Sequence, residues 1–156
     1  MLALALVSAA AAGKPDPKQF LTVDARHKVV AVTLDAGDGS GNGGFNFDGY
    51  GRGELQVRVP LGWRVRVTCA NRSAMRASCA VVRGPMTAEP AFRGASTPDP
   101  VQGLDSGAKA TFSFVASRAG SYRFASLVPG EEDARMWDVL EVARGGAPSI
   151  SARPGP

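Results

Sequence analysis

Three side chains of different chemistry recur at a five-residue interval near the C-terminal end of the chain. Ser126, Glu131 and Met136 place an alcohol, a carboxylate and a thioether in the segment SLVPGEEDARM, between two strand-like runs. A serine hydroxyl is a poor metal ligand at neutral pH, a carboxylate suits hard cations, and a lone thioether binds Cu(II) feebly. Ser126 also has no histidine near it in the sequence, which argues against a serine hydrolase.

The same segment contains a run of acidic residues, Glu131, Glu132 and Asp133. Converging carboxylates could perform general acid–base catalysis or hold a hard metal ion. We favour a solvated loop, because adjacent carboxylates need not converge on one point. We therefore predict that the chain is not an enzyme.

The elements that must position this loop alternate apolar and polar residues with the period of a β-strand. The alternation is clearest in ELQVRVP and WRVRVTC, which are joined by a tight Leu61-Gly62 connection. A glycine-rich stretch at 37–44 is interpreted as a flexible turn, and the aperiodic segment 84–107 as a long excursion. The pattern predicts an all-β Greek-key β-sandwich of seven to eight strands. The strand-like runs are 19–37, 54–60, 63–69, 78–84, 109–116, 119–126 and 136–144.

Both ends of the chain differ in composition from the middle. Residues 1–18 are interpreted as an export signal and linker, with cleavage near Ala12, because an apolar run ends in small residues. The alternative is a short membrane anchor, but the run is too short to span a bilayer comfortably. The domain is predicted to cover 19–145 and a disordered tail 146–156. The mature chain is expected to be secreted or periplasmic, in the cell envelope, with no stable membrane span.

The charge of the chain is moderately basic. The formal net charge is +4, and the excess of cations is almost entirely arginine scattered along 156 residues. Scattered arginines are typical of solvated strand faces, whereas a nucleic-acid interface gathers them into a block. We therefore predict no nucleic-acid partner.

The cysteines and the histidine are few enough to consider one by one. In an oxidising compartment the pair Cys69 and Cys79 suggests one disulfide, and the alternative is two buried free thiols. His27 is the one histidine and begins an early strand, where such residues usually lie at the surface or are hydrogen-bonded.

Three segments, in the right order, resemble a known family. FNFDGYGRGELQVRVPLGWRVRVTCANRS (45–73) resembles the signature region of sulfocyanin, a blue-copper protein of the cupredoxin class. MRASCAVV (75–82) resembles the strand that opens with the first copper-binding histidine, and AGSYRFASLVPGEEDARMW (119–137) resembles the C-terminal ligand loop. The resemblance implies a cupredoxin-like sandwich, in which the strands carrying Cys69 and Cys79 could face each other.

The resemblance also assigns the copper-ligand positions. The two histidine positions fall on Ala77 and Glu131, the cysteine position falls on Ser126, and the axial methionine is Met136. A blue-copper site needs two imidazoles and a thiolate, so three of the four ligands are missing. No metal and no cofactor are therefore expected. The alternative is copper bound through replacement ligands, with Cys79 as the thiolate if it is free.

These observations lead to one functional prediction and one alternative. We predict an exported sulfocyanin-like domain that has lost three of four copper ligands and serves as a copper-free binding or structural module, with an unidentified envelope protein as its partner. The alternative is a copper-binding electron-transfer protein that uses replacement ligands. The charge change at Glu131 further suggests an ion pair with Arg76 or Arg135 that fills the vacated pocket.

Overall fold

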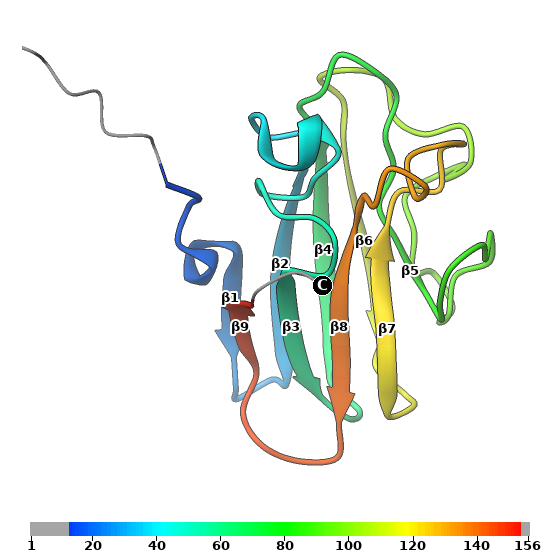
Figure 1. Ribbon diagram of the computed structural model, residues 1–156. Coiled ribbons are helices and arrows are strands. Elements are labelled where there is room, and N and C mark those ends of the chain that lie inside the picture. Colours follow the sequence, from blue (N-terminus) through cyan, green and yellow to red (C-terminus); the bar gives the residue numbers. More distant parts are fainter. Residues whose placement is uncertain (1–12, 154–156) are drawn as a thin grey trace, which may run out of the picture.

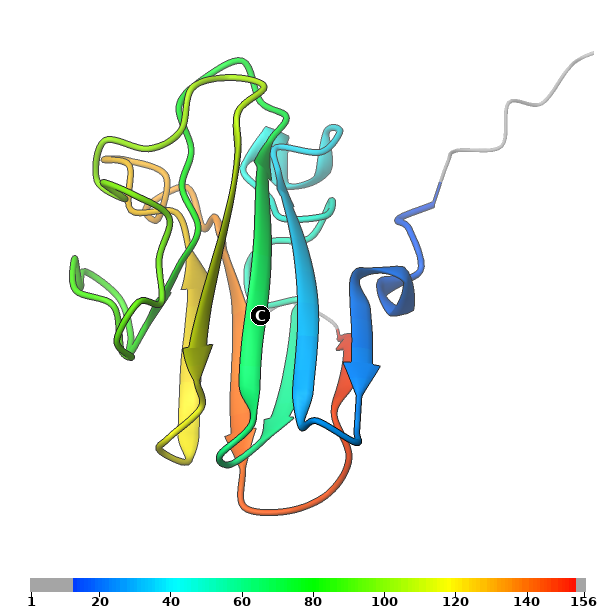
Figure 2. The ribbon, with the colours of Figure 1, turned by 180° about the vertical axis from the view of Figure 1, so that it is seen from behind.

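The computed structural model describes residues 13–153, which form a sandwich of two β-sheets (Figures 1 and 2). Regular elements are short and are joined by turns, apart from two long irregular stretches between β2 and β3 and between β5 and β6. The elements are η1 (Pro17–Phe20), β1 (Leu21–Asp24), β2 (Val29–Ala36), η2 (Gly41–Gly44), β3 (Leu55–Pro60), β4 (Arg64–Asn71), β5 (Ala80–Val82), β6 (Lys109–Val115), β7 (Gly120–Ala125), β8 (Trp137–Ala143) and β9 (Ser149–Ala152).

The order of the strands confirms the predicted Greek-key sandwich. One sheet has the order β1-β2-β4-β6 and the other β5-β7-β8-β3-β9. The pairs β2–β4 and β3–β8 are parallel and the other pairs are antiparallel. Consecutive strands therefore often lie in different sheets, and the described residues contain nine strands instead of seven or eight.

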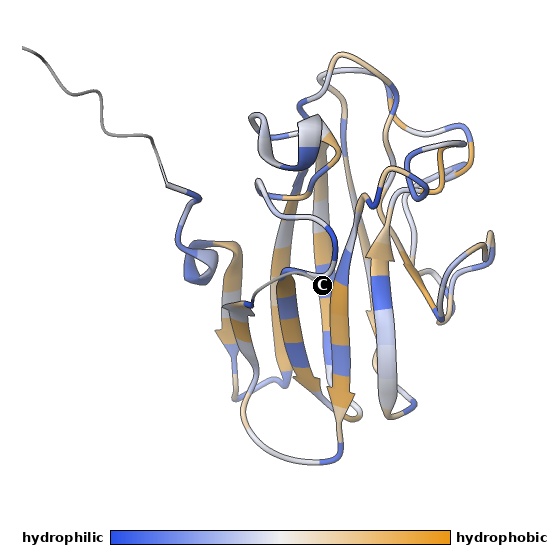
Figure 3. Cartoon of the chain, viewed as in Figure 1, coloured by the Kyte–Doolittle hydropathy of each residue, from blue (hydrophilic) through white to orange (hydrophobic). Residues whose placement is uncertain are grey.

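The core fills the space between the sheets with the inward-facing positions of the alternating strands. Figure 3 shows this alternation as stripes of opposite hydropathy along β2, β3 and β8. Phe47, Phe114 and Phe124 are among the largest fully buried side chains. Each such side chain contributes about 1.5–3 kcal/mol through removal of apolar surface from water.

The long excursion 84–107 is anchored to this core by one aromatic side chain. Phe92 stacks on Phe114 at 5.1 Å between ring centroids and lies 4.7 Å from the ring of Tyr122. The excursion contains no helix but makes isolated bridges, Ala77 with Leu104 and Ala80 with Ser96. Its course is therefore fixed by packing and short backbone contacts.

A disulfide connects the two sheets. Cys69 on β4 and Cys79, one residue before β5, are bonded, with their Cα atoms 6.0 Å apart. Both residues are fully buried, and because they are bonded to each other the alternative of two free thiols is wrong. Closing a loop of this length stabilises the fold by about 3 kcal/mol through its effect on the unfolded chain.

The predicted disordered tail, 146–156, is wrong for residues 149–152. These residues form β9, which pairs antiparallel with β3. Ile150 is buried against the core, and the Arg153 backbone N–H donates to the Glu54 carbonyl at 2.7 Å. The domain accordingly extends past residue 145.

The predicted export signal falls mostly outside the described residues. Residues 1–12, with the expected cleavage point, and residues 154–156 are not among them. Within 13–153, no helix combines the length and the apolar character needed to cross a membrane.

Candidate functional site

The predicted ligand positions gather at one end of the sandwich. The Ser126 N–H lies 3.4 Å from the Met136 carbonyl, and the Met136 N–H donates to the Glu131 carbonyl at 3.0 Å. The segment containing Ala77 approaches through Ser78, whose N–H donates to Ser126 Oγ at 3.0 Å. The structure therefore brings all four positions into one buried neighbourhood where β7 ends and β8 begins.

Ser126 and Glu131 are joined by a side-chain hydrogen bond inside this neighbourhood. Ser126 Oγ donates to Glu131 Oε2, while the same Oγ accepts from Ser78. Ser78 Oγ in turn accepts from the Leu127 N–H at 2.9 Å. Burial raises the pKa of Glu131, and the hydrogen bond from Ser126 partly opposes that rise. The site is thus occupied by a closed polar network of the chain's own groups.

The three consecutive acidic residues have three different environments. Glu131 is only 5% exposed, Glu132 is partly buried, and Asp133 is exposed. Glu132 Oε2 accepts from the Met86 N–H at 2.9 Å. The carboxylates therefore do not converge as an acid–base pair. The interpretation of the whole run as a solvated loop is wrong for Glu131, because its side chain is buried and hydrogen-bonded to Ser126.

The expected ion pair of Glu131 with an arginine is not formed among residues 13–153. Arg76 instead pairs with Asp105 at 2.6 Å. Arg135 is exposed, in a left-handed backbone conformation with φ 65°. The partner of Glu131 is the hydroxyl of Ser126, so the pocket is filled by hydrogen bonding instead of by an ion pair.

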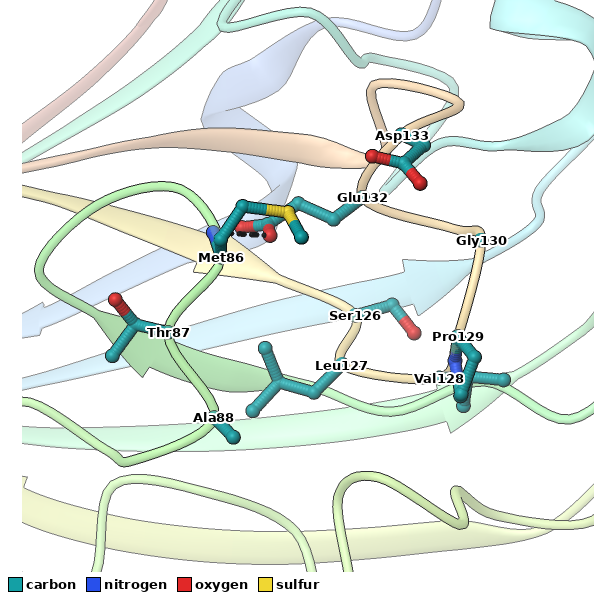
Figure 4. Close-up of a pocket in the computed structure, with 10 residues that line it drawn as sticks. All are labelled: Met86, Thr87, Ala88, Ser126, Leu127, Val128, Pro129, Gly130, Glu132 and Asp133. Carbon is teal, nitrogen blue, oxygen red and sulfur yellow. Dashed lines mark hydrogen bonds between the residues drawn. The ribbon is translucent and has the colours of Figure 1, made fainter.

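A cavity of about 180 Å³ opens beside this network, between the segment 86–88 and the loop 126–133 (Figure 4). Its walls are mainly apolar, and Met86 lies across from Leu127. Glu132 forms a third side of the cavity and accepts a hydrogen bond from the Met86 N–H. Its other carboxylate oxygen lies 4.0 Å from the Arg123 guanidinium. That guanidinium lies over the Trp137 ring, 3.7 Å from the ring centroid.

The glycine-rich stretch, predicted to be a flexible turn, braces the site loop. The Asn42 side-chain amide donates to the carbonyls of Phe45 at 2.7 Å and Ala134 at 3.0 Å. Asn42 adopts a left-handed conformation with φ 49° inside η2. The Arg52 N–H donates to the Arg135 carbonyl at 3.0 Å, and a Cβ at Gly51 would lie only 2.9 Å from Asn42 Nδ2 and 3.2 Å from this carbonyl. The stretch is therefore an ordered support, which the sequence interpretation missed.

Two buried carboxyl groups near this support were also missed. Asp48 Oδ1 accepts from the Asp35 N–H at 2.8 Å, and Asp138 Oδ1 accepts from the Leu55 N–H at 3.0 Å. Burial raises the pKa of Asp48 to about 8 and raises that of Asp138 well above its usual value. Asp48 is therefore mainly protonated at neutral pH, and burial favours the protonated form of Asp138 as well. A signal for Asp138 was present, since it shares strand parity with Leu140 and Val142.

The donor atoms at the site do not fit copper in the blue geometry. That geometry needs a thiolate and two imidazoles. Cys79 is in a disulfide, and His27 is exposed and bonded to Asp24 at 2.8 Å, at the end of β1 remote from the site. Across residues 13–153, no group of three or more histidine, cysteine, aspartate or glutamate side chains is arranged to hold a metal ion.

Comparison with protein families decides the family of the chain. The sulfocyanin (SoxE) domain matches residues 16–97, which is more than half of the chain. The chain belongs to the sulfocyanin family. The matched stretch of this family member includes Ala77 and both cysteines but ends before the loop 126–136.

Solved structures share the fold of this sulfocyanin-family chain. Reduced auracyanin from Roseiflexus castenholzii has a TM-score of 0.51 and 21% identity, over 74% of this chain and 95% of its own. Reduced rusticyanin has a TM-score of 0.52 and 21% identity, over 74% and 80%. Auracyanin A from Chloroflexus aurantiacus, described as a "blue" copper protein, has a TM-score of 0.51 and 19% identity, over 74% of this chain and 99% of its own. No curated protein sequence matches the chain. Identity at this level supports a common cupredoxin fold and nothing further.

Proposed function

We propose that this chain is an exported, copper-free member of the sulfocyanin family that serves as a binding or structural module of the cell envelope. The observation that carries the proposal is the hydrogen bond between Ser126 and Glu131, formed where the family resemblance places a cysteine and a histidine ligand. A fold can persist after the site built on it has been lost.

The Ser126–Glu131 network supports the proposal because it opposes a metal ion energetically. A cation at this point would need the charged form of Glu131, which burial disfavours, and would compete with Ser126 for the Glu131 carboxyl group. A cation that displaced Ser126 Oγ from the Ser78 N–H would also leave a buried donor without a partner, which costs about 1–3 kcal/mol. At the remaining ligand position, the methyl group of Ala77 offers no atom that could coordinate a metal ion.

The disulfide supports the proposal in two ways. It removes Cys79, the one thiolate that could have rebuilt a soft-metal site near Ala77. It also links the two sheets covalently close to that site, so the fold does not depend on a metal to hold them there. Disulfides persist in oxidising compartments, which agrees with an exported protein.

The experiment that tests the proposal is a copper titration of the full chain, with and without reductant, followed by absorption spectroscopy and bound-metal analysis. We expect no stoichiometric binding in the oxidised chain and no intense visible band in either state. An intense thiolate-to-copper band at one equivalent would overturn the proposal and support electron transfer through replacement ligands.

A further inference from the structure

The end of the sandwich remote from the loop 126–136 is one continuous surface. Four connections meet there, at the bottom of Figures 1 and 2. The Arg64 N–H donates to the Lys28 carbonyl at 3.0 Å, the Leu61 N–H to the Ala143 carbonyl at 2.7 Å, and the Gly62 N–H to the Ala116 carbonyl at 2.8 Å. We call this surface the basic end and define it as residues 25–28, 61–64, 115–119 and 144–148.

Exposed cations dominate the basic end. Arg26, Lys28, Arg64 and Arg144 are all exposed, and within residues 13–153 no ion pair involves any of them. Arg118 is excluded from this set, because it donates to the Ala91 carbonyl and covers the Phe92 ring.

Acidic residues are mostly found elsewhere. Beside the basic end, Asp24 is bonded to His27, and Glu141 stands in register with Arg58 on the neighbouring strand. The other acidic residues all lie outside the basic end, and Asp48 and Glu131 among them are buried. The basic end itself therefore carries an excess of cations over acidic residues.

Apolar side chains are exposed among these cations. Leu61, at the tip of the β3–β4 turn, is 36% exposed, and Val115, at the end of β6, is 40% exposed. Trp63 is half-buried beside them and packs on the core. A soluble polyanion needs only the cations, whereas the headgroup region of a bilayer favours cations together with aliphatic and aromatic side chains.

We propose that the basic end docks onto an anionic lipid bilayer. Arg26, Lys28, Arg64 and Arg144 face the lipid phosphates, and Leu61 enters the boundary between headgroups and acyl chains. Each cation near such a surface increases binding about fivefold. Docking in this orientation turns the loop 126–136 and its cavity away from the membrane. The inference does not depend on whether the chain binds copper.

The test is cosedimentation of the full chain with vesicles, at several salt concentrations. The vesicles are phosphatidylcholine alone or phosphatidylcholine mixed with phosphatidylglycerol. The test variant is Arg26→Gln/Arg64→Gln. The matched control, Lys109→Gln/Arg135→Gln, removes the same charge from exposed residues at the opposite end. A further variant, Leu61→Ser, removes the apolar tip, and thermal unfolding checks that every variant is folded.

We expect salt-sensitive binding to the anionic vesicles that exceeds binding to phosphatidylcholine. Binding should fall about 25-fold in Arg26→Gln/Arg64→Gln, because each of the two cations contributes about fivefold, and it should fall less in the control. Leu61→Ser should also weaken it. Equal losses in test and control variants would overturn the proposal. If the chain also binds heparin, and Leu61→Ser changes neither heparin binding nor vesicle binding, the proposal would be overturned as well. The basic end would then bind a soluble polyanion.

Discussion

Ser126 and Glu131, five residues apart, are joined by a hydrogen bond in the interior of the protein, at the end of β7. The relationship is selective, because the neighbouring Glu132 and Asp133 are directed elsewhere. The Ser126 hydroxyl is therefore one of the groups that stabilise the loop 126–136.

Removing that hydroxyl should destabilise the fold. Ser126→Ala leaves the Ser78 N–H without its acceptor and Glu131 without its donor, so the free energy of unfolding should fall by about 1–3 kcal/mol in urea denaturation. Ser121→Ala, on the exposed side of the same strand, is the matched control and should change it by less than about 0.5 kcal/mol. Equal stability of the two variants would show that the hydrogen bond is unimportant.

Asp48 should make the protein less stable as the pH rises. The folded chain keeps its proton up to a pKa of about 8, whereas the unfolded chain loses it near 3.8. Between these values the folded state binds more protons, so the unfolding free energy contributed by Asp48 falls with increasing pH. Asp48→Asn should therefore raise the stability near pH 8 and reduce the slope between pH 4 and pH 8.

Urea denaturation across this pH range measures the effect, with exposed Asp133→Asn as the control of equal charge change. A slope that Asp48→Asn leaves unaltered would contradict the account of Asp48, since Glu131 and Asp138 would then carry the pH dependence alone.

The Cys69–Cys79 bond should stabilise the native fold by about 3 kcal/mol, given its short loop. The measurement is the urea midpoint with and without reductant. The double variant Cys69→Ala/Cys79→Ala should be less stable than the oxidised chain and insensitive to reductant. If reductant leaves the midpoint of the wild type unchanged under conditions that reduce the bond, this stabilisation is absent.

Asn42 should restrict the motion of the loop 126–136, although it lies 92 residues before its partner Ala134 in the sequence. Asn42→Ala removes the donor to the Ala134 carbonyl, so amide hydrogen exchange in the following residues should accelerate several-fold. Asn42→Gly is the control for the left-handed backbone at this position, since glycine adopts it without strain. Both variants should accelerate exchange. Acceleration in Asn42→Ala alone would assign the effect to backbone strain.

The sandwich could be predicted from the sequence because its signal is local. Alternation in β3 and β4 identifies half-buried strands without reference to any partner. The strand β9 was missed because Ile150 is its one large apolar residue and because it gains its order from pairing with β3.

The site was harder to predict because its properties depend on partners that are distant in the sequence. The burial of Glu131 depends on Ser126 and Ser78, which meet across 48 residues of sequence. The support by Asn42 spans 92 residues. No periodicity in the sequence reports such contacts.

The central claim is that the four positions keep the place of a copper site and that three of them, Ala77, Ser126 and Glu131, no longer carry its ligands. The most direct measurement is the visible spectrum, with one equivalent of copper, of the full chain and of the folded variant Ala77→His/Ser126→Cys/Glu131→His. We expect no intense band from the wild type and an intense thiolate-to-copper band from the variant. A folded variant that stays colourless, or a coloured wild type, would contradict the claim.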